Sequence, residues 1–133
     1  MVSSLVYLDA SAIVRLVLEE PGWEALVDLL REHPHRVTSA LSVAEVGRAV
    51  RRAGAVPQRN ARATAVLDGL DQVAISAAVL RRAGELEPAT LRTLDAIHLA
   101  TALALGRVDA FVAYDARLAA AATMHGFRVA ALP

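Results

Sequence analysis

Residues 2–19 read VSSLVYLDASAIVRLVLE, and two successive patterns within them indicate the fold class. Its first part, residues 2–8, is short and rich in β-branched and aromatic side chains, which is typical of a strand. Residues 12–19 have the apolar spacing of a helix. Asp9 stands where the first pattern gives way to the second. The stretch therefore predicts a buried strand that is followed at once by a helix.

The same alternation continues along the chain. Further strand patterns lie at residues 36–39, 72–75, 110–113 and 127–130, and helical patterns at 23–31, 42–52, 57–67, 77–86, 93–105 and 116–125. This alternation predicts an α/β fold, with a mostly parallel central sheet of about five strands and helices on both faces. The chain has 133 residues and shows no internal repeat or long linker, so we expect residues 1–133 to form a single domain.

Composition narrows the functional class. The absence of cysteine excludes disulfides, thiolate metal sites and a cysteine nucleophile. The net charge is +0, so no global field attracts nucleic acid, although all 14 basic residues are arginine. Hydrophobic residues make up 56% of the chain, a surplus that favours a second copy or a partner. The sequence has neither a basic leader nor an apolar run of about 20 residues, so we expect a cytoplasmic protein that does not enter a membrane.

Four acidic residues stand where a short apolar run gives way to a helical pattern: Asp9, Glu45, Asp95 and Asp115. Helix starts that follow parallel strands gather at one edge of the sheet, where α/β proteins bind ligands. Carboxylates that meet there repel one another unless a cation neutralises them. Carboxylate and water oxygens suit Mg²⁺ or Mn²⁺, and such a metal supports phosphoryl displacement by water. The four acids together predict a hard-metal site.

Each acid also has a purely structural interpretation. Asp9 and Asp115 fit the N-caps of the helices that follow them. Glu45 fits a capping box with Ser42, and Asp95 suits the dipole of its own helix. For any one residue both interpretations stay open, and the functional one depends on the convergence of all four.

Arginines and one histidine accompany these acids. Arginine forks match phosphate oxygens, so four arginines are candidate RNA contacts, with a solvated helix face as the alternative: Arg48, Arg51, Arg52 and Arg92. His98 lies on the same helical face as Asp95. It is either a proton relay or a hydrogen-bonded packing residue.

The motifs YLDASAIVRLVLEEPG, SALSVAEVGRAV, LRTLDAIHLATAL and DAFVAYDARLAAAA together resemble the PIN-domain ribonucleases, and more narrowly the VapC-type toxins of bacterial toxin–antitoxin pairs. The resemblance covers nearly the whole chain. It implies a PIN-like, Rossmann-like fold and a Mg²⁺- or Mn²⁺-dependent endoribonuclease that cuts tRNA or ribosomal RNA. The family's catalytic, metal-binding acids fall here on Asp9, Glu45, Asp95 and Asp115. Ser11 matches the hydroxyl residue that supports the first aspartate.

The resemblance also implies a homodimer and a VapB-type antitoxin that wraps the toxin and directs an arginine toward the acids. One departure stands out. Many relatives carry Thr or Ser two residues before the fourth acid, where this chain has Ala113, and this weakens the case for a second metal. The alternative is a catalytically weak RNA- or antitoxin-binding module on the same fold. A phospho-acceptor receiver domain requires a lysine, which this chain lacks.

Overall fold

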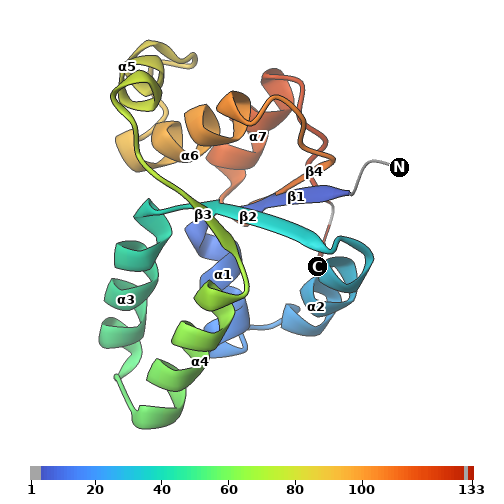
Figure 1. Ribbon diagram of the computed structural model, residues 1–133, viewed down its shortest axis with the longest axis vertical. Coiled ribbons are helices and arrows are strands. Elements are labelled where there is room, and N and C mark those ends of the chain that lie inside the picture. The colour runs from blue at the N-terminus through green and yellow to red at the C-terminus, as the bar shows by residue number, and fades with distance from the viewer. Residues whose placement is uncertain (1–3, 131) are drawn as a thin grey trace.

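A parallel sheet lies at the centre of the protein, for which a computed structural model describes residues 4–130 and 132–133 (Figure 1). The strands run in the spatial order β3-β2-β1-β4, and every pair is parallel. Their bounds are β1 Leu5–Leu8, β2 His35–Ser39, β3 Asp71–Val73 and β4 Ala110–Val112. The predicted α/β class and parallel sheet are therefore confirmed.

Helices cover both faces of the sheet, as predicted, and Figure 1 shows the two layers above and below it. One layer contains α1 (Ala10–Leu18), α2 (Trp23–Glu32), α3 (Leu41–Ala53) and α4 (Pro57–Asp68). The other contains α5 (Ala77–Glu85), α6 (Thr93–Ala104) and α7 (Ala116–Met124). In the part of the chain that the structure describes, no helix is long and apolar enough to cross a membrane.

The sequence-based strands differ from the observed ones at both ends of the chain. The prediction of a fifth strand at residues 127–130 is wrong, because only Val129 pairs with the sheet, through one parallel bridge to Phe111. Among the described residues, the backbone of this segment is joined to β4 at one residue only: the Phe111 amide donates to the Arg128 carbonyl, and the Phe111 carbonyl accepts from the Ala130 amide. At the start of the chain, β1 begins at Leu5, and residues 2 and 3 of the predicted strand lie outside the described residues.

Strand β1 separates two apolar cores because its side chains alternate between the two faces of the sheet. Val6 and Leu8 face the layer of α1 to α4, and Tyr7 faces the layer of α6 and α7. Tyr7 stacks on Phe111 of β4, with ring centroids 5.3 Å apart. The pattern VYL is therefore apolar throughout, since β1 is buried on both faces.

The strand order also creates the crevice in which a site can form. The chain moves outward from β1 to β2 and β3, and then returns to add β4 on the other side of β1. Ligands bind in such sheets at the carboxyl ends of the strands where the order reverses, which here is the boundary of β1 and β4. Helices α1 and α7 begin at this boundary.

Candidate active site at the carboxyl edge of the sheet

Asp9 lies at the end of β1, on the boundary with β4. It is the N-cap of α1, and its Oδ1 accepts hydrogen bonds from the Ala12 amide at 3.0 Å and the Ser11 hydroxyl at 2.7 Å. Its residue surface is only 4% exposed. Burial raises the pKa of Asp9 from 3.8 to about 6, although the Ser11 hydrogen bond acts in the opposite direction. The cap interpretation is thus correct, and it leaves the burial of this charge unexplained.

Ser11 connects the ends of β1 and β4. Its hydroxyl donates to Asp9 and accepts a hydrogen bond from the Tyr114 amide at 3.0 Å. One oxygen therefore fixes both the rotamer of the aspartate and the path of the chain after β4. Oδ2 of Asp9 has no hydrogen-bond partner among the described residues, so it remains available to a ligand.

Asp115 and Asp95 lie on either side of one arginine. Asp115 is the N-cap of α7, where its Oδ1 accepts from the amides of Arg117 and Leu118 at 3.0 and 3.1 Å. The Arg92 guanidinium lies 3.1 Å from Oδ2 of Asp115 and 3.4 Å from Oδ2 of Asp95. Burial raises the pKa of Asp95, and Arg92 partly offsets that rise.

Glu45 takes part in a buried chain of hydrogen bonds. Its Oε1 lies 2.6 Å from Nε2 of His98, and Nδ1 of the same ring lies 2.8 Å from the Tyr7 hydroxyl. The capping-box interpretation of Glu45 is wrong. Helix α3 begins at Leu41, one residue earlier than the pattern indicates, so the Ser42 side chain is buried inside the helix and cannot cap it.

Tyr7 is the site residue that the sequence analysis missed. It is fully buried, and burial together with the nearby Asp9 carboxylate holds its pKa well above the usual range. A tyrosine within a buried strand needs a partner for its hydroxyl, and this was the available signal. The partner, His98, could not be identified because it is 91 residues away in the sequence.

The donor set suits a hard divalent cation, but its members are partly engaged with protein groups. Among residues 4–130 and 132–133, no three His, Asp or Glu side chains already form a metal-binding cluster. His98 holds Glu45, and Arg92 stands between Asp95 and Asp115. The free Oδ2 of Asp9 and the carboxylate chemistry fit Mg²⁺ or Mn²⁺. The metal ligation remains a prediction.

A groove leads from the acids across α1 and α3. It has a volume of about 700 Å³, and its lining includes Ser11, Glu45 and Asp115 together with apolar residues such as Val14 and Ala49. Arg48 and Arg52 line its side. Arg51 is exposed but lies outside this groove, so the predicted arginine group is only partly brought together.

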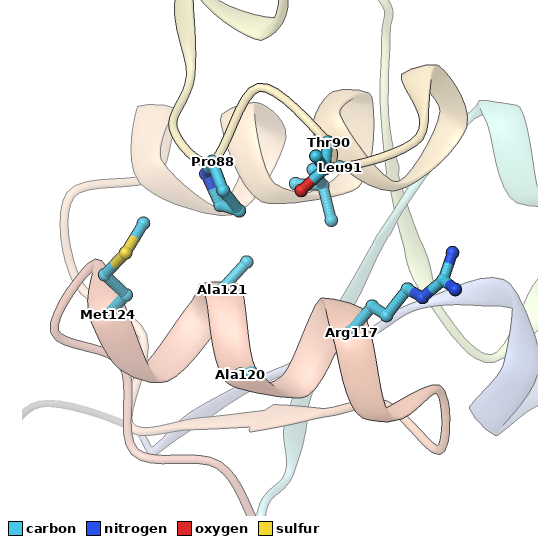
Figure 2. A pocket seen from close by; sticks show the side chains of 7 residues that line it. All are labelled: Pro88, Thr90, Leu91, Arg117, Ala120, Ala121 and Met124. Atoms are coloured by element: carbon cyan, nitrogen blue, oxygen red, sulfur yellow. The ribbon is translucent and has the colours of Figure 1, made fainter.

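A second pocket lies in the other helical layer, next to the segment that carries Arg92. It has a volume of about 570 Å³ and lies between α7 and residues 88–91, as Figure 2 shows. Ala121 and Met124 of α7 face Pro88 and Leu91 across it, with Arg117 toward one end. Because Leu91 precedes Arg92, the pocket wall continues directly into the segment that contacts Asp95 and Asp115.

Comparison with known proteins gives consistent results for the whole chain. A model of the PIN domain matches residues 6–124. Ribonuclease VapC46 of Mycobacterium tuberculosis is 45% identical over 127 residues, which span 95% of this chain and 96% of that protein. Ribonuclease VapC47 of the same species is 39% identical and covers 92% of this chain and 93% of its own length.

Two solved structures share the fold. One is M. tuberculosis VapC20, described as a toxin that cleaves the sarcin-ricin loop, with a TM-score of 0.75 at 18% identity over 96% of this chain and 99% of that one. The other is VapBC2 of Rickettsia felis, bound to a DNA fragment from its promoter, with a TM-score of 0.73 at 15% identity over 97% of this chain and 99% of that one.

Proposed function

The chain belongs to the PIN domain family, and within it to the VapC ribonucleases; on that premise we propose that it is a metal-dependent endoribonuclease and the toxin of a toxin–antitoxin pair. The observation that supports this most directly is the buried carboxylate of Asp9. Its raised pKa means that the ionised form is unfavourable in the folded chain, so stability alone does not account for an acid at this place. Perturbed acids in a crevice are typical of catalytic sites.

The roles of the acids follow from their positions. Asp9, Glu45, Asp95 and Asp115 would hold Mg²⁺ or Mn²⁺, with Ser11 keeping Asp9 in place. When bound, the metal supplies positive charge that stabilises phosphodiester oxygens during displacement and makes water easier to deprotonate. Arg92 neutralises the repulsion between Asp95 and Asp115 while no cation is bound.

RNA would reach the acids along surfaces that carry arginine. Arg48 and Arg52 line the groove on one side, and Arg117 lies at the pocket on the other. Guanidinium groups bind phosphate through paired N–H donors. We propose tRNA or ribosomal RNA as the substrate and the cytoplasm as the place of action. The VapC20 structure supports this substrate class, since that protein is described as a toxin that cleaves the sarcin-ricin loop.

A VapB-type antitoxin and a second copy of the chain are the proposed protein partners. The R. felis relative and a Klebsiella pneumoniae relative are toxin–antitoxin complexes. In this chain several large apolar side chains are exposed, which suits such contacts: Val43, Val56, Ile75, Leu80, Leu94 and Met124.

Cleavage of total tRNA and ribosomal RNA tests the proposal. Purified protein, free of antitoxin, would be incubated with Mg²⁺, with Mn²⁺ and with EDTA. Discrete cuts that require metal and disappear in Asp95→Asn are expected. Asp28→Asn is the matched control, because Asp28 lies on α2 with a side chain that is 73% exposed. Both variants must melt as folded proteins.

Two results would contradict the proposal. Persistent cutting by Asp95→Asn, purified clean of host nucleases, would show that the acids do not carry the activity. RNA or antitoxin binding by the folded wild type without turnover in either metal would favour the catalytically weak binding module.

A further inference from the structure

We propose that His98 is a positioning residue for the reaction, which holds Glu45 at the acidic edge, and that Tyr7 fixes which ring nitrogen faces Glu45. The proposal rests on the proposed function in one respect only, namely that Glu45 contributes to the metal site. The chain of hydrogen bonds from Tyr7 through His98 to Glu45 is itself a structural observation.

The three residues come from separate elements and meet inside the protein. Tyr7 is on β1, Glu45 on α3 and His98 on α6, so the chain crosses from one helical layer to the other beside the end of the sheet. Tyr7 is fully buried and His98 is 1% exposed, whereas the side chain of Glu45 is 23% exposed. The Tyr7 and His98 end of the chain is thus shielded from solvent, whereas the Glu45 carboxylate is partly exposed at the site.

The donors and acceptors specify one tautomer of the histidine. An ionised carboxylate can only accept, so Nε2 of His98 must carry a proton and donate it to Oε1 of Glu45 across 2.6 Å. In the neutral imidazole Nδ1 then carries the lone pair and accepts from the Tyr7 hydroxyl across 2.8 Å. Tyr7 acts through His98 and does not contact Glu45.

The consequence concerns the second oxygen of Glu45. Oε2 has no hydrogen-bond partner in the described part of the chain, so it remains free for a ligand while Oε1 is held. Without His98, the long, partly exposed side chain of Glu45 regains rotamer freedom. Mutating a residue that hydrogen-bonds to a metal-ligating carboxylate typically lowers metal affinity or activity about 10- to 100-fold.

Mn²⁺ binding in the absence of RNA, measured by calorimetry, is the primary test, with cleavage measured in parallel. His98→Leu should weaken Mn²⁺ binding about 10-fold or more. His98→Gln, whose amide N–H₂ can occupy the place of Nε2, should recover a substantial part of that loss. Leu99→Ala is the matched control: it opens a cavity on the same helix, lowers the melting temperature and should leave Mn²⁺ affinity unchanged.

Nitrogen-15 NMR of the imidazole gives a readout that is independent of activity. The wild type should show the Nε2–H tautomer of His98, and Tyr7→Phe should show a mixture of tautomers with a smaller loss of Mn²⁺ affinity. An Nδ1–H tautomer or an imidazolium in the wild type would overturn the proposal. The proposal would also be overturned if His98→Leu bound Mn²⁺ as tightly as the wild type. If that variant does not fold, a Tyr7→Phe protein with unchanged Mn²⁺ affinity and an unchanged His98 tautomer would overturn it. A wild type that binds no Mn²⁺ and cuts no RNA would instead refute the proposed function, and the positioning role with it.

Discussion

Replacing Asp9 by asparagine should make the metal-free protein more stable at neutral pH, although it should abolish cleavage. Asparagine has the same shape, and its carbonyl oxygen can still accept from the Ala12 amide and the Ser11 hydroxyl. The variant differs from the wild type mainly in lacking a buried charge. Acids placed for function commonly reduce stability in this way.

The size of the effect follows from the pKa of Asp9. Folding raises this pKa from 3.8 to about 6. A rise of about two units corresponds to about 3 kcal/mol, because each unit is worth about 1.4 kcal/mol. The folded protein binds the proton more tightly than the unfolded chain, so this contribution is fully present below about pH 4 and is lost as the pH rises through about 6. For a chain of 133 residues, 3 kcal/mol corresponds to about 10 °C in Tm.

Urea unfolding followed by circular dichroism, in EDTA at several pH values between 4 and 8, measures the effect. The difference between Asp9→Asn and the wild type isolates the titration of Asp9 from that of other groups. It should be largest above pH 7 and shrink toward pH 4. Equal stability at pH 7.5, or a difference that does not change with pH, would refute the reasoning. Adding Mg²⁺ should stabilise only the wild type, since a ligand stabilises the state that binds it.

Three further changes test other contacts at the two edges of the sheet. Ser11→Ala leaves the part-buried Tyr114 amide without its acceptor, so we expect a loss of about 1 kcal/mol in urea unfolding; an unchanged midpoint would contradict this. Arg92 lowers the pKa of Asp95, so Arg92→Gln should raise that pKa further. Carbon-13 NMR of the carboxyl groups in the metal-free protein measures this pKa, and an unchanged value would contradict the effect of Arg92 on Asp95. Asp109 has a lowered pKa, chiefly because it accepts from the Leu5 amide, so its stabilising effect is present above its ordinary pKa and is lost as the pH falls through the lowered value. In Asp109→Asn the free energy of unfolding should therefore fall less steeply as the pH is lowered. An acid transition identical to that of the wild type would exclude a stabilising role of the Asp109 carboxylate.

The order of strands and helices could be predicted because each element carries its own pattern. The helix at residues 57–67 begins at a proline and ends before a glycine, and the observed α4 differs from it by one residue. Asp9 and Asp115 were also predictable as caps, since an N-cap contacts only the amides two or three residues ahead. Such local features need no knowledge of the rest of the fold.

The contacts that define the site were not predictable in this way, because their partners are distant in the sequence. Glu45 binds a histidine 53 residues later, and Arg92 reaches an aspartate 23 residues later. A local pattern assigned Glu45 to a capping box, and the tertiary contact with His98 replaced that arrangement. The prediction of a fifth strand was wrong for a related reason, since the local pattern at residues 127–130 does not specify how much of the segment pairs with β4.

The alternation along β1 determines where this chain can be lengthened. Val6 and Leu8 face one core and Tyr7 the other, so inserting one residue ahead of Tyr7 would reverse every side chain and move Asp9 out of the crevice. The turn between α3 and α4 carries no such constraint, since residues 54–56 are exposed and face no core. Tags, labels or circularly permuted termini for engineered versions of the protein therefore belong in this turn.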